Sequence, residues 1–224
     1  SEVLDLGETQ TNDSQIRSSN HLTLEALFKN NGANTIQMGV VKDDMDSITK
    51  LIETALLTSN IVVTTGGVSV GDYDFVQDVI KDKLKAEVLF HGVNLKPGMH
   101  ILLALKDNKI IVALPGFAYS STVCAMLYVL PLIYKFRNSN EKLPLVKARI
   151  NQDFSRFQAK TIFTACNVEY KNGEYQINFD GKKSGTSAIL TNMLESPALL
   201  IQKENSENIK AGDLVDILLL NNLK

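Results

Sequence analysis

The sequence of 224 residues has no tryptophan, only two cysteines and almost no net charge. Cys124 and Cys166 lie far apart and outside any metal-binding spacing, which favours packed thiols in a reducing compartment over a disulfide framework. The three histidines are not spaced as metal ligands. With 23 basic and 25 acidic side chains, nothing in the composition favours a nucleic-acid surface or an anionic membrane. We therefore expect neither as a partner.

No targeting segment is expected from the sequence. Residues 1–10 have neither a basic flank nor an apolar core, so no signal peptide is expected, and the cytoplasm is the expected location. Residues 114–134 carry no formal charge, and their length alone suggests a membrane span. A Pro-Gly turn and a polar run open this segment, however, and its apolar part is too short. We predict instead a buried helix that begins near Ser120 and is kinked or ended near Pro131.

What the sequence does contain is a regular alternation of helical and strand patterns. Asn20 can cap a helix that Asn31-Gly32 ends, residues 35–41 resemble a strand, and Asp46 can cap a second amphipathic helix. This alternation predicts a three-layer αβα sandwich around a mostly parallel sheet. A third helix is expected to begin at residues 72–74, and further strands at residues 61–64, 87–93, 101–105 and 110–114.

The pattern changes after the polar stretch 137–140, which Pro144 closes. Short β-like pieces separated by Gly, Asn and Asp turns predict a small all-β, barrel-like domain. We therefore expect an α/β domain over residues 1–140 and the all-β domain over residues 141–224. The expected strands of the second domain cover residues 147–150, 162–168, 175–179, 198–202 and 215–220.

One stretch has the composition of a binding loop: residues 64–75 read TTGGVSVGDYDF and follow a short apolar run. Ligands of open parallel sheets lie beyond the carboxyl ends of the strands, where glycines let backbone N–H groups approach an anion. The loop is therefore a candidate phosphate cradle. Gly66 and Gly71 have the spacing of a P-loop, but Asp72-Tyr73 stands where Lys and Ser/Thr are required, which excludes an ordinary nucleotide hydrolase.

Carboxylates beside a phosphate repel it unless a cation lies between them. Asp72 or Asp74, with the Asp43-Asp44 pair, are candidate ligands for Mg²⁺ through oxygen atoms and water. The alternatives are purely structural roles: a tight Gly-Gly turn without a ligand, and acids that only cap helices. Local chemistry leaves both interpretations open.

Four motifs together resemble a known family. GGVSVGDYD (residues 66–74), LKPG (95–98), LPG (114–116) followed by Ser120, and AGDLVDILLL (211–220) are similar, in that order, to the molybdopterin molybdenumtransferases, which include bacterial MoeA proteins and the gephyrin E domain. Supporting matches are Ser1-Glu2-Val3, Gln15-Ile16 with Asn20, and Lys42-Asp43-Asp44. The resemblance covers nearly the whole chain.

The resemblance implies conversion of adenylylated molybdopterin and molybdate to molybdenum cofactor, with Mg²⁺ assisting the release of AMP. By motif position, Glu2, Asp43 and Asp74 correspond to the family's catalytic carboxylates, with Asp43 and Asp74 as metal ligands. It further implies a cytoplasmic homodimer, with handover from a molybdopterin adenylyltransferase and to molybdoenzymes. The residues implied to bind substrate are Gly66, Gly67, Ser69, Gly71, Asp72, Lys96, Pro115, Gly116 and Ser120.

The sequence departs from the family's patterns at three places. Met99 follows Lys96-Pro97-Gly98 where the family commonly has K-P-G-K-P, Phe117 stands where its L-P-G-N-P-V-S motif has an amide, and Ser18 replaces an acid. A non-catalytic molybdopterin-binding or scaffold module therefore stays open as the alternative function. The family proteins begin with two further domains and the first strand of the sandwich, whereas this sequence starts at Ser1, in the loop that follows that strand. We therefore expect an unpaired edge in the sheet.

Overall fold

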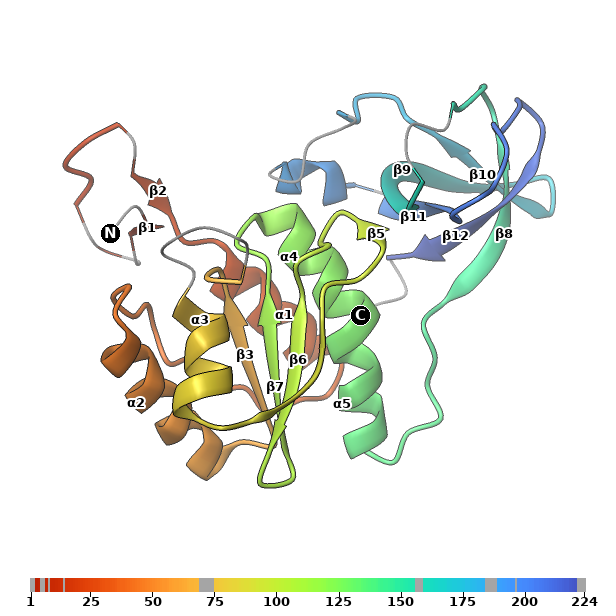
Figure 1. Cartoon of the computed structure of the whole chain (residues 1–224). Helices are drawn as coiled ribbons and strands as arrows, with labels where there is room; N and C mark the ends of the chain where they lie inside the picture. Colours follow the sequence, from red (N-terminus) through yellow and green to blue (C-terminus); the bar gives the residue numbers. More distant parts are fainter. Residues whose placement is uncertain are drawn as a thin grey trace.

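The computed structural model describes residues 3–4, 7, 9–13, 15–68, 75–155, 159–183, 189–195 and 197–220. It contains an α/β part and a β-barrel that lies beside the long helix of the α/β part (Figure 1). Five predicted site residues lie outside the described residues: Glu2, Ser69, Gly71, Asp72 and Asp74.

The sheet of the α/β part has the strand order β3-β7-β6-β4. β3 runs parallel to β7, whereas the pairs β6–β7 and β4–β6 are antiparallel. The prediction of a mostly parallel sheet is therefore wrong for the strands that the structure describes here. The strands are β3 (Ile61–Thr65), β4 (Glu87–His91), β6 (Leu102–Lys106) and β7 (Lys109–Leu114).

A two-residue turn explains the antiparallel pairing of β6 with β7. Asp107 and Asn108 both have positive φ, 49° and 61°, between the paired residues Lys106 and Lys109. Two such residues form the hairpin turn whose twist matches that of the flanking strands, and Asp and Asn tolerate this conformation better than most residues. The chain therefore reverses directly instead of crossing over through a helix.

Helices cover both faces of this sheet, which confirms the three-layer architecture. Along β7, Ile111 and Ala113 pack against α2 and α3, whereas Val112 and Leu114 pack against α1 and α4. This alternation follows from the two-residue period of a strand. The helices are α1 (Asn20–Asn30), α2 (Met45–Thr58), α3 (Phe75–Asp78) with a π-helical turn (Val79–Lys83), α4 (Ala118–Cys124) and α5 (Leu130–Phe136).

The predicted buried helix is present, but it does not end near Pro131. α4 continues through a π-helical turn (Ala125–Val129) into α5, and the Leu130 N–H bonds to the Ala125 carbonyl. This local rearrangement lets the helix pass a residue that has no N–H to donate. The 19-residue helix Ala118–Phe136 is the one described helix long and apolar enough to cross a membrane, and 67% of its apolar window is buried inside the fold.

Two local predictions are wrong. The side chain that caps α2 is Asp44, which accepts a hydrogen bond from the Ser47 N–H at 2.8 Å; Asp46 lies in the first turn. Residues 35–41 form no strand, although their apolar residues alternate. Ile36, Met38 and Val40 are all exposed there, and this segment has no strand partner among the described residues.

The barrel is closed by five strands in the order β10-β8-β12-β11-β9, with β10 also paired to β9. This confirms the predicted barrel-like fold. A sixth strand, β5 (Leu95–Lys96), comes from the α/β part and pairs in parallel with β9. The barrel strands are β8 (Leu145–Ile150), β9 (Thr161–Lys171), β10 (Glu174–Asn178), β11 (Pro197–Gln202) and β12 (Leu214–Leu219). The other elements are β1 (Val3–Leu4), β2 (Ile16–Arg17) and a 3₁₀ turn (Leu190–Met193).

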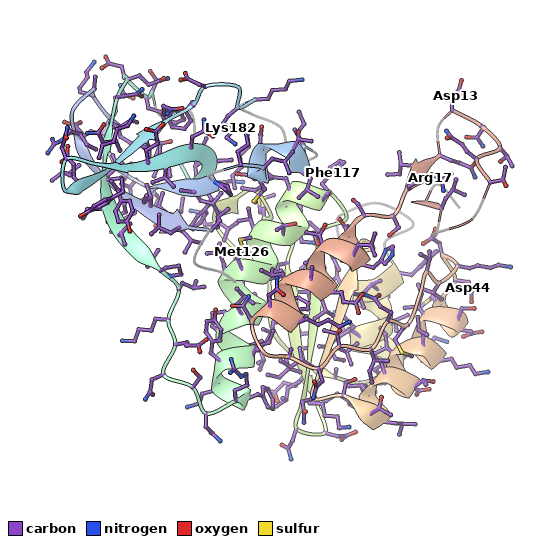
Figure 2. The ribbon with its side chains drawn as sticks, turned by 180° about the vertical axis from the view of Figure 1, so that it is seen from behind. Asp13, Arg17, Asp44, Phe117, Met126 and Lys182 are labelled. Carbon is purple, nitrogen blue, oxygen red and sulfur yellow. The ribbon has the colours of Figure 1, made fainter. Side chains whose placement is uncertain are left out.

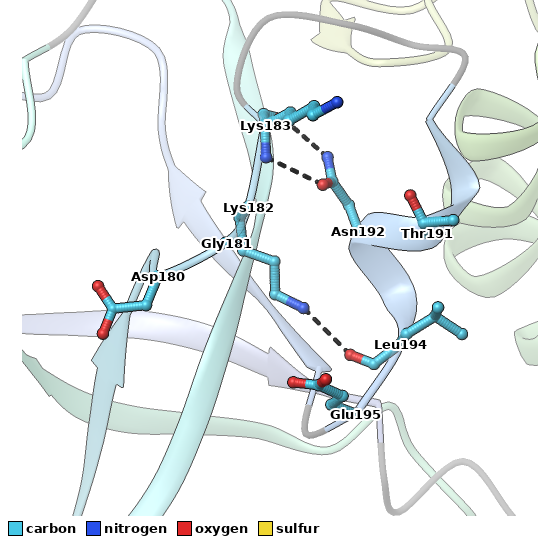
Figure 3. Close-up of a pocket in the computed structure, with 8 residues that line it drawn as sticks. All are labelled: Asp180, Gly181, Lys182, Lys183, Thr191, Asn192, Leu194 and Glu195. Carbon is cyan, nitrogen blue, oxygen red and sulfur yellow. Dashed lines mark hydrogen bonds between the residues drawn. The ribbon is translucent and has the colours of Figure 1, made fainter.

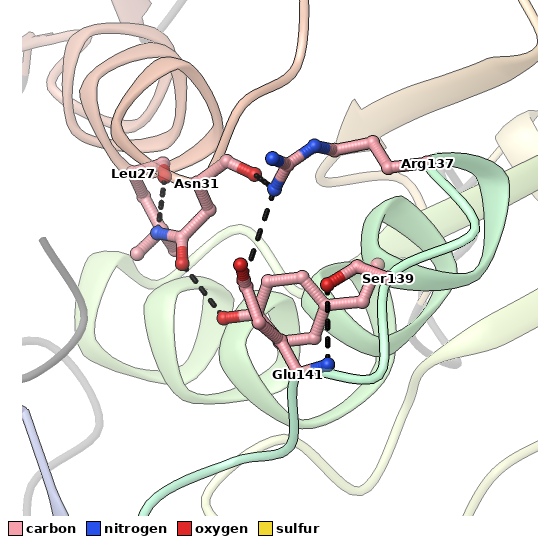
Figure 4. Close-up of polar contacts among 6 residues, drawn as sticks. Leu27, Asn31, Arg137, Ser139 and Glu141 are labelled. Atoms are coloured by element: carbon pink, nitrogen blue, oxygen red, sulfur yellow. Dashed lines mark hydrogen bonds and ion pairs between the residues drawn. The ribbon is translucent and has the colours of Figure 1, made fainter.

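Hydrogen bonds connect the end of α1 to the end of α5 (Figure 4). The Tyr134 hydroxyl donates to Asn31 Oδ1 at 2.7 Å, and the Asn31 amide donates to the Leu27 carbonyl at 2.8 Å. Arg137 donates to the Asn31 carbonyl at 3.0 Å and lies 3.7 Å from a Glu141 carboxylate oxygen. Asn31 is buried, so these bonds satisfy polar groups that water does not reach.

Candidate functional site

Two of the predicted loops meet at the carboxyl ends of β3 and β7. The Gly66 N–H donates to the Leu114 carbonyl at 2.9 Å, which extends the β3–β7 ladder by one bond. A side chain on Gly116 would place its Cβ 3.5 Å from the Gly66 Cα, so the two loop backbones are in contact. The structure therefore brings together Gly66, Pro115 and Gly116, which sequence reasoning placed in one site.

Gly67 is required by close packing as well as by conformation. Its φ is +69°, in the left-handed region that favours glycine, and a Cβ there would lie 2.6 Å from Val76 Cγ2. Val76 belongs to α3, so the missing side chain lets this helix pack closely against the loop. The Gly-Gly pair thus has a structural role, which is compatible with an additional ligand role.

Asn20 contacts the same edge of the sheet. It is the first residue of α1, and its side-chain amide donates to the Gly116 carbonyl at 2.8 Å. The residue before it, Ser19, makes no capping bond through its side chain. Sequence reasoning expected Asn20 to be the cap, whereas the structure uses it to hold the loop after β7.

Thr64 is a polar residue that sequence reasoning missed. Its hydroxyl oxygen is buried near the end of β3 and has no hydrogen-bond partner among the described residues. Buried hydroxyls are normally paired, so this atom is a candidate contact for a ligand or a water molecule. The sequence signal was available, since Thr64 directly precedes Thr65 and the Gly-Gly pair.

Lys96 lies in a separate segment, where β5 joins the barrel sheet. Two residues later the chain packs against α4: a Cβ on Gly98 would lie 3.5 Å from the Ser120 carbonyl oxygen and 2.1 Å from Cys124 Sγ. The Cys124 thiol donates to the Gly98 carbonyl at 3.4 Å. Ser120 is only 2% exposed, so its hydroxyl lies within the packed start of α4 and not on the surface.

The predicted metal site is described only in part. Asp43 is exposed, and no hydrogen bond or ion pair engages its carboxylate in the part of the chain that the structure describes. The Asp44 carboxylate caps α2, and the hydrogen bond that it accepts from the Ser47 N–H lowers its pKa. No group of three or more His, Cys, Asp or Glu side chains suited to a metal ion occurs among the described residues. Asp74 lies outside them, so the pair Asp43 and Asp74 remains a prediction.

Two cavities in the described structure are lined by residues other than the predicted site residues. A cavity of about 200 Å³ in the barrel is lined by Lys182, Asn192 and Leu194, where the Lys182 ammonium donates to the Leu194 carbonyl at 3.1 Å (Figure 3). Another, of about 420 Å³, lies between the π-helical turn after α3 and β4 and is lined by Gln77 and His91. Neither is lined by Gly66, Lys96 or Gly116, but His91 Nε2 lies 3.4 Å from the Val68 carbonyl oxygen, so the second cavity is close to the glycine loop.

The exposed ends of α2 and α4 flank the loop edge. Figure 2 shows Phe117 at the tip of α4 and Asp44 at the tip of α2, with Asp13 and Arg17 on the N-terminal arm nearby. Phe117 is 63% exposed at the N-cap position of α4. Its ring therefore faces solvent beside the Pro115-Gly116 loop.

A family model described as a probable molybdopterin binding domain matches residues 2–135. The chain belongs to this family. The matched region contains β3, β7 and both glycine loops, so the molybdopterin-binding domain includes the loop edge described above. This result confirms the resemblance inferred from the motifs.

Relatives and solved structures extend the match beyond this domain. Molybdopterin molybdenumtransferase from Staphylococcus aureus is 31% identical over 221 residues, which cover 98% of this chain and 52% of that protein. The Staphylococcus epidermidis enzyme of the same name is also 31% identical, over 224 residues. The structure of the molybdopterin biosynthesis MoeA protein from Pyrococcus horikosii superposes with a TM-score of 0.78 and 25% identity, over 100% of this chain and 52% of that one. The chain thus spans about half the length of these relatives.

Proposed function

We propose that the chain is the catalytic portion of a molybdopterin molybdotransferase, which inserts molybdate into adenylylated molybdopterin and releases AMP. The observation that supports this function best is the contact between two glycine loops, Gly66-Gly67 and Pro115-Gly116, at the carboxyl ends of neighbouring strands in a molybdopterin-binding domain. Ligands of α/β sheets bind at such edges.

In this proposal, the chain's own groups bind and orient the substrate. The Gly67 backbone N–H faces the phosphates, because the Gly66 N–H is already bonded to the Leu114 carbonyl, and Asn20 fixes the position of the Gly116 carbonyl. Lys96 supplies a positive charge from the neighbouring β5 segment. A precise arrangement of such donors stabilises the charge that develops as the phosphoanhydride breaks.

Mg²⁺ is proposed to be held by Asp43 and Asp74, with Glu2 as a further catalytic carboxylate. Asp43 fits this role because it is exposed and its carboxylate is not committed to another contact among the described residues. Bound there, the cation would neutralise phosphate charge. We further propose a cytoplasmic homodimer that receives its substrate from a molybdopterin adenylyltransferase and passes its product to molybdoenzymes.

The alternative is a binding or scaffold module with a degenerate site. Phe117 favours it, because this ring is exposed where the resembled motif has an amide that can donate hydrogen bonds. Such a module would bind the substrate without converting it.

The test measures substrate binding and AMP release separately. The native protein that contains this chain, and the chain of 224 residues alone, are supplied with adenylylated molybdopterin, molybdate and Mg²⁺, with the Staphylococcus aureus relative as the positive control. AMP release by the native protein supports the transferase, whereas binding without AMP release supports the module. Absence of binding by the native protein would contradict both. We expect the chain alone to bind weakly and not to turn over, because it spans half of its relatives' length.

A further inference from the structure

A lysine from the barrel reaches the segment that carries Lys96. The Lys160 ammonium lies 2.8 Å from the Met99 sulfur. Lys160 directly precedes β9, and Met99 follows β5 by three residues. The contact therefore links the barrel to the Lys96-Pro97-Gly98 turn.

The pairing of β5 with β9 brings the segments that carry the two lysines together. In the parallel pair β5–β9, Leu95 is opposite Thr161 and Lys96 is opposite Ile162. Lys160 directly precedes Thr161, the β9 residue paired with Leu95, and its ammonium contacts Met99, three residues after Lys96. The pairing and this contact together bring the two lysines to the same junction.

Neither ammonium is neutralised by a carboxylate in the described part of the chain, in which ion pairs involve other lysines. The Glu204 carboxylate accepts a hydrogen bond from Asn94, which also donates to the Ala159 carbonyl, and it forms no ion pair with either lysine in the described part of the chain. A methionine sulfur is a weak acceptor and carries no charge that could balance an ammonium. Two like charges at one junction repel each other, and an anion between them would relieve this repulsion.

We propose that Lys96 and Lys160 together form a binding subsite for a tetrahedral oxyanion at the junction of the α/β part and the barrel. This inference rests on the proposed function, in which the oxyanion is either a phosphate group of the pterin substrate or molybdate. Lys160 supplies from β9 a positive charge that the resembled K-P-G-K-P pattern has at position 99. The second positive charge of the subsite thus comes from the barrel and not from the Lys96-Pro97-Gly98 turn.

The test compares oxyanion affinity in matched variants. Backbone amide signals around Gly98 are followed by NMR while phosphate, molybdate or, as an ionic-strength control, chloride is added. Lys160→Met should weaken oxyanion binding about tenfold, as expected for loss of a charge-assisted contact. Lys96→Met should weaken it similarly. Lys171→Met removes the same charge at the far end of β9, where Lys171 pairs with Glu169, and should change the affinity by less than about twofold.

A relocation variant tests the position of the charge. The double variant Met99→Lys/Lys160→Met removes the ammonium at position 160 and introduces one at position 99, the other partner of the contact. We expect this double variant to recover most of the lost affinity. A response to phosphate alone or to molybdate alone identifies the source of the oxyanion. Wild-type affinity in the Lys160→Met variant, or a wild-type response no larger than that to chloride, would overturn the subsite.

Failure of the proposed function has a different signature. Adenylylated molybdopterin is titrated into the wild-type protein in the same buffer, and absence of binding counts against the function. The phosphate and molybdate titrations test Lys160 independently of that result.

Discussion

Gly98 and Cys124 are packed so closely that a Cβ on Gly98 would lie 2.1 Å from the Cys124 sulfur. Gly98 also has a φ of +100°, which residues with a side chain rarely adopt. The last residue of the LKPG motif is therefore fixed by its contact with α4 as well as by its own turn. This contact holds the segment that carries Lys96 against the helix that follows the Gly116 loop.

We predict that Gly98→Ala lowers the free energy of unfolding by about 2–4 kcal/mol, since overpacking adds to the cost of a left-handed alanine. Gly92→Ala is the matched control, because its φ is +83° but the nearest atom to a Cβ there is 3.7 Å away. The cost of Gly98→Ala should also be smaller in a Cys124→Ala background. Urea unfolding measures all four variants, and equal costs at Gly98 and Gly92 would show that the Cys124 contact is unimportant.

Asp44 stabilises α2 as its cap. The hydrogen bond from the Ser47 backbone N–H lowers the pKa of Asp44 from its ordinary value of 3.8. A depressed pKa means that the carboxylate stabilises the fold above pH 3.8, and that this contribution is lost as the pH falls through the folded-state pKa. Asp44→Ala should therefore lower the melting temperature at pH 7, and the difference should shrink in acid. Asp46→Ala, at an exposed position, serves as the control and should have a smaller effect.

The hydroxyl of Tyr134 is predicted to stabilise the junction of α1 and α5. Tyr134→Phe removes its bond to Asn31 Oδ1 and leaves that buried atom unpaired, at a cost of about 1–3 kcal/mol in the free energy of unfolding. Tyr170→Phe removes a hydroxyl that bonds the Gly173 carbonyl on an exposed residue and should cost no more than about 0.5 kcal/mol. Denaturant titrations compare the two, and similar losses would contradict the importance of the buried bond.

Asp43→Asn should reduce AMP release by on the order of a hundredfold without lowering the melting temperature. The physical reason is that the change removes a charge and a metal ligand but no structural contact of the described chain. Asp74→Asn should act similarly. Asp46→Asn, another exposed acid close in sequence, is the control and should retain activity. Near-normal AMP release by the Asp43 variant would remove this residue from the proposed metal site.

Both cysteines should resist alkylation in the folded protein. Burial raises the pKa of Cys124 and of Cys166 from 9.0 to about 12, so almost no thiolate is present at pH 8. Iodoacetamide followed by mass spectrometry should label them slowly in native buffer and rapidly in urea. Unfolded thiols lose their protons near pH 9.0 whereas the folded ones retain theirs, so the free energy of unfolding should also fall as the pH rises above 9.0. Rapid native labelling at pH 8 would contradict the packed state of these thiols.

Much of the fold was predictable, because the spacing of apolar residues and the length of each apolar segment distinguish buried strands from helices. The strand at Ile61–Thr65 and the helix at Met45–Thr58 appear where the sequence pattern placed them. The pairing direction was not predictable from the same pattern. It depends on the two positive-φ residues Asp107 and Asn108, whose turn reverses the chain between β6 and β7.

Residues 35–41 were predicted as a strand that the structure does not contain. Alternating apolar side chains satisfy the periodicity of a strand, but a strand exists only where a neighbour completes its backbone hydrogen bonds. β5 is missed for the complementary reason: two residues are too short to show a period, and their pairing with β9 defines the strand. The contact of Lys160 with Met99 depends on this pairing, so no local pattern could have indicated it.

The contribution of β5 to the barrel sheet also bears on how the molecule unfolds. The backbone bonds of Leu95 and Lys96 to β9 join two parts that differ in sequence position and architecture. The same hydrophobic core contains Tyr119 and Met126 of the long helix together with Leu199 and Leu218 of the barrel. Opening of either part would expose apolar surface of the other, so we expect the chain to unfold as one cooperative unit.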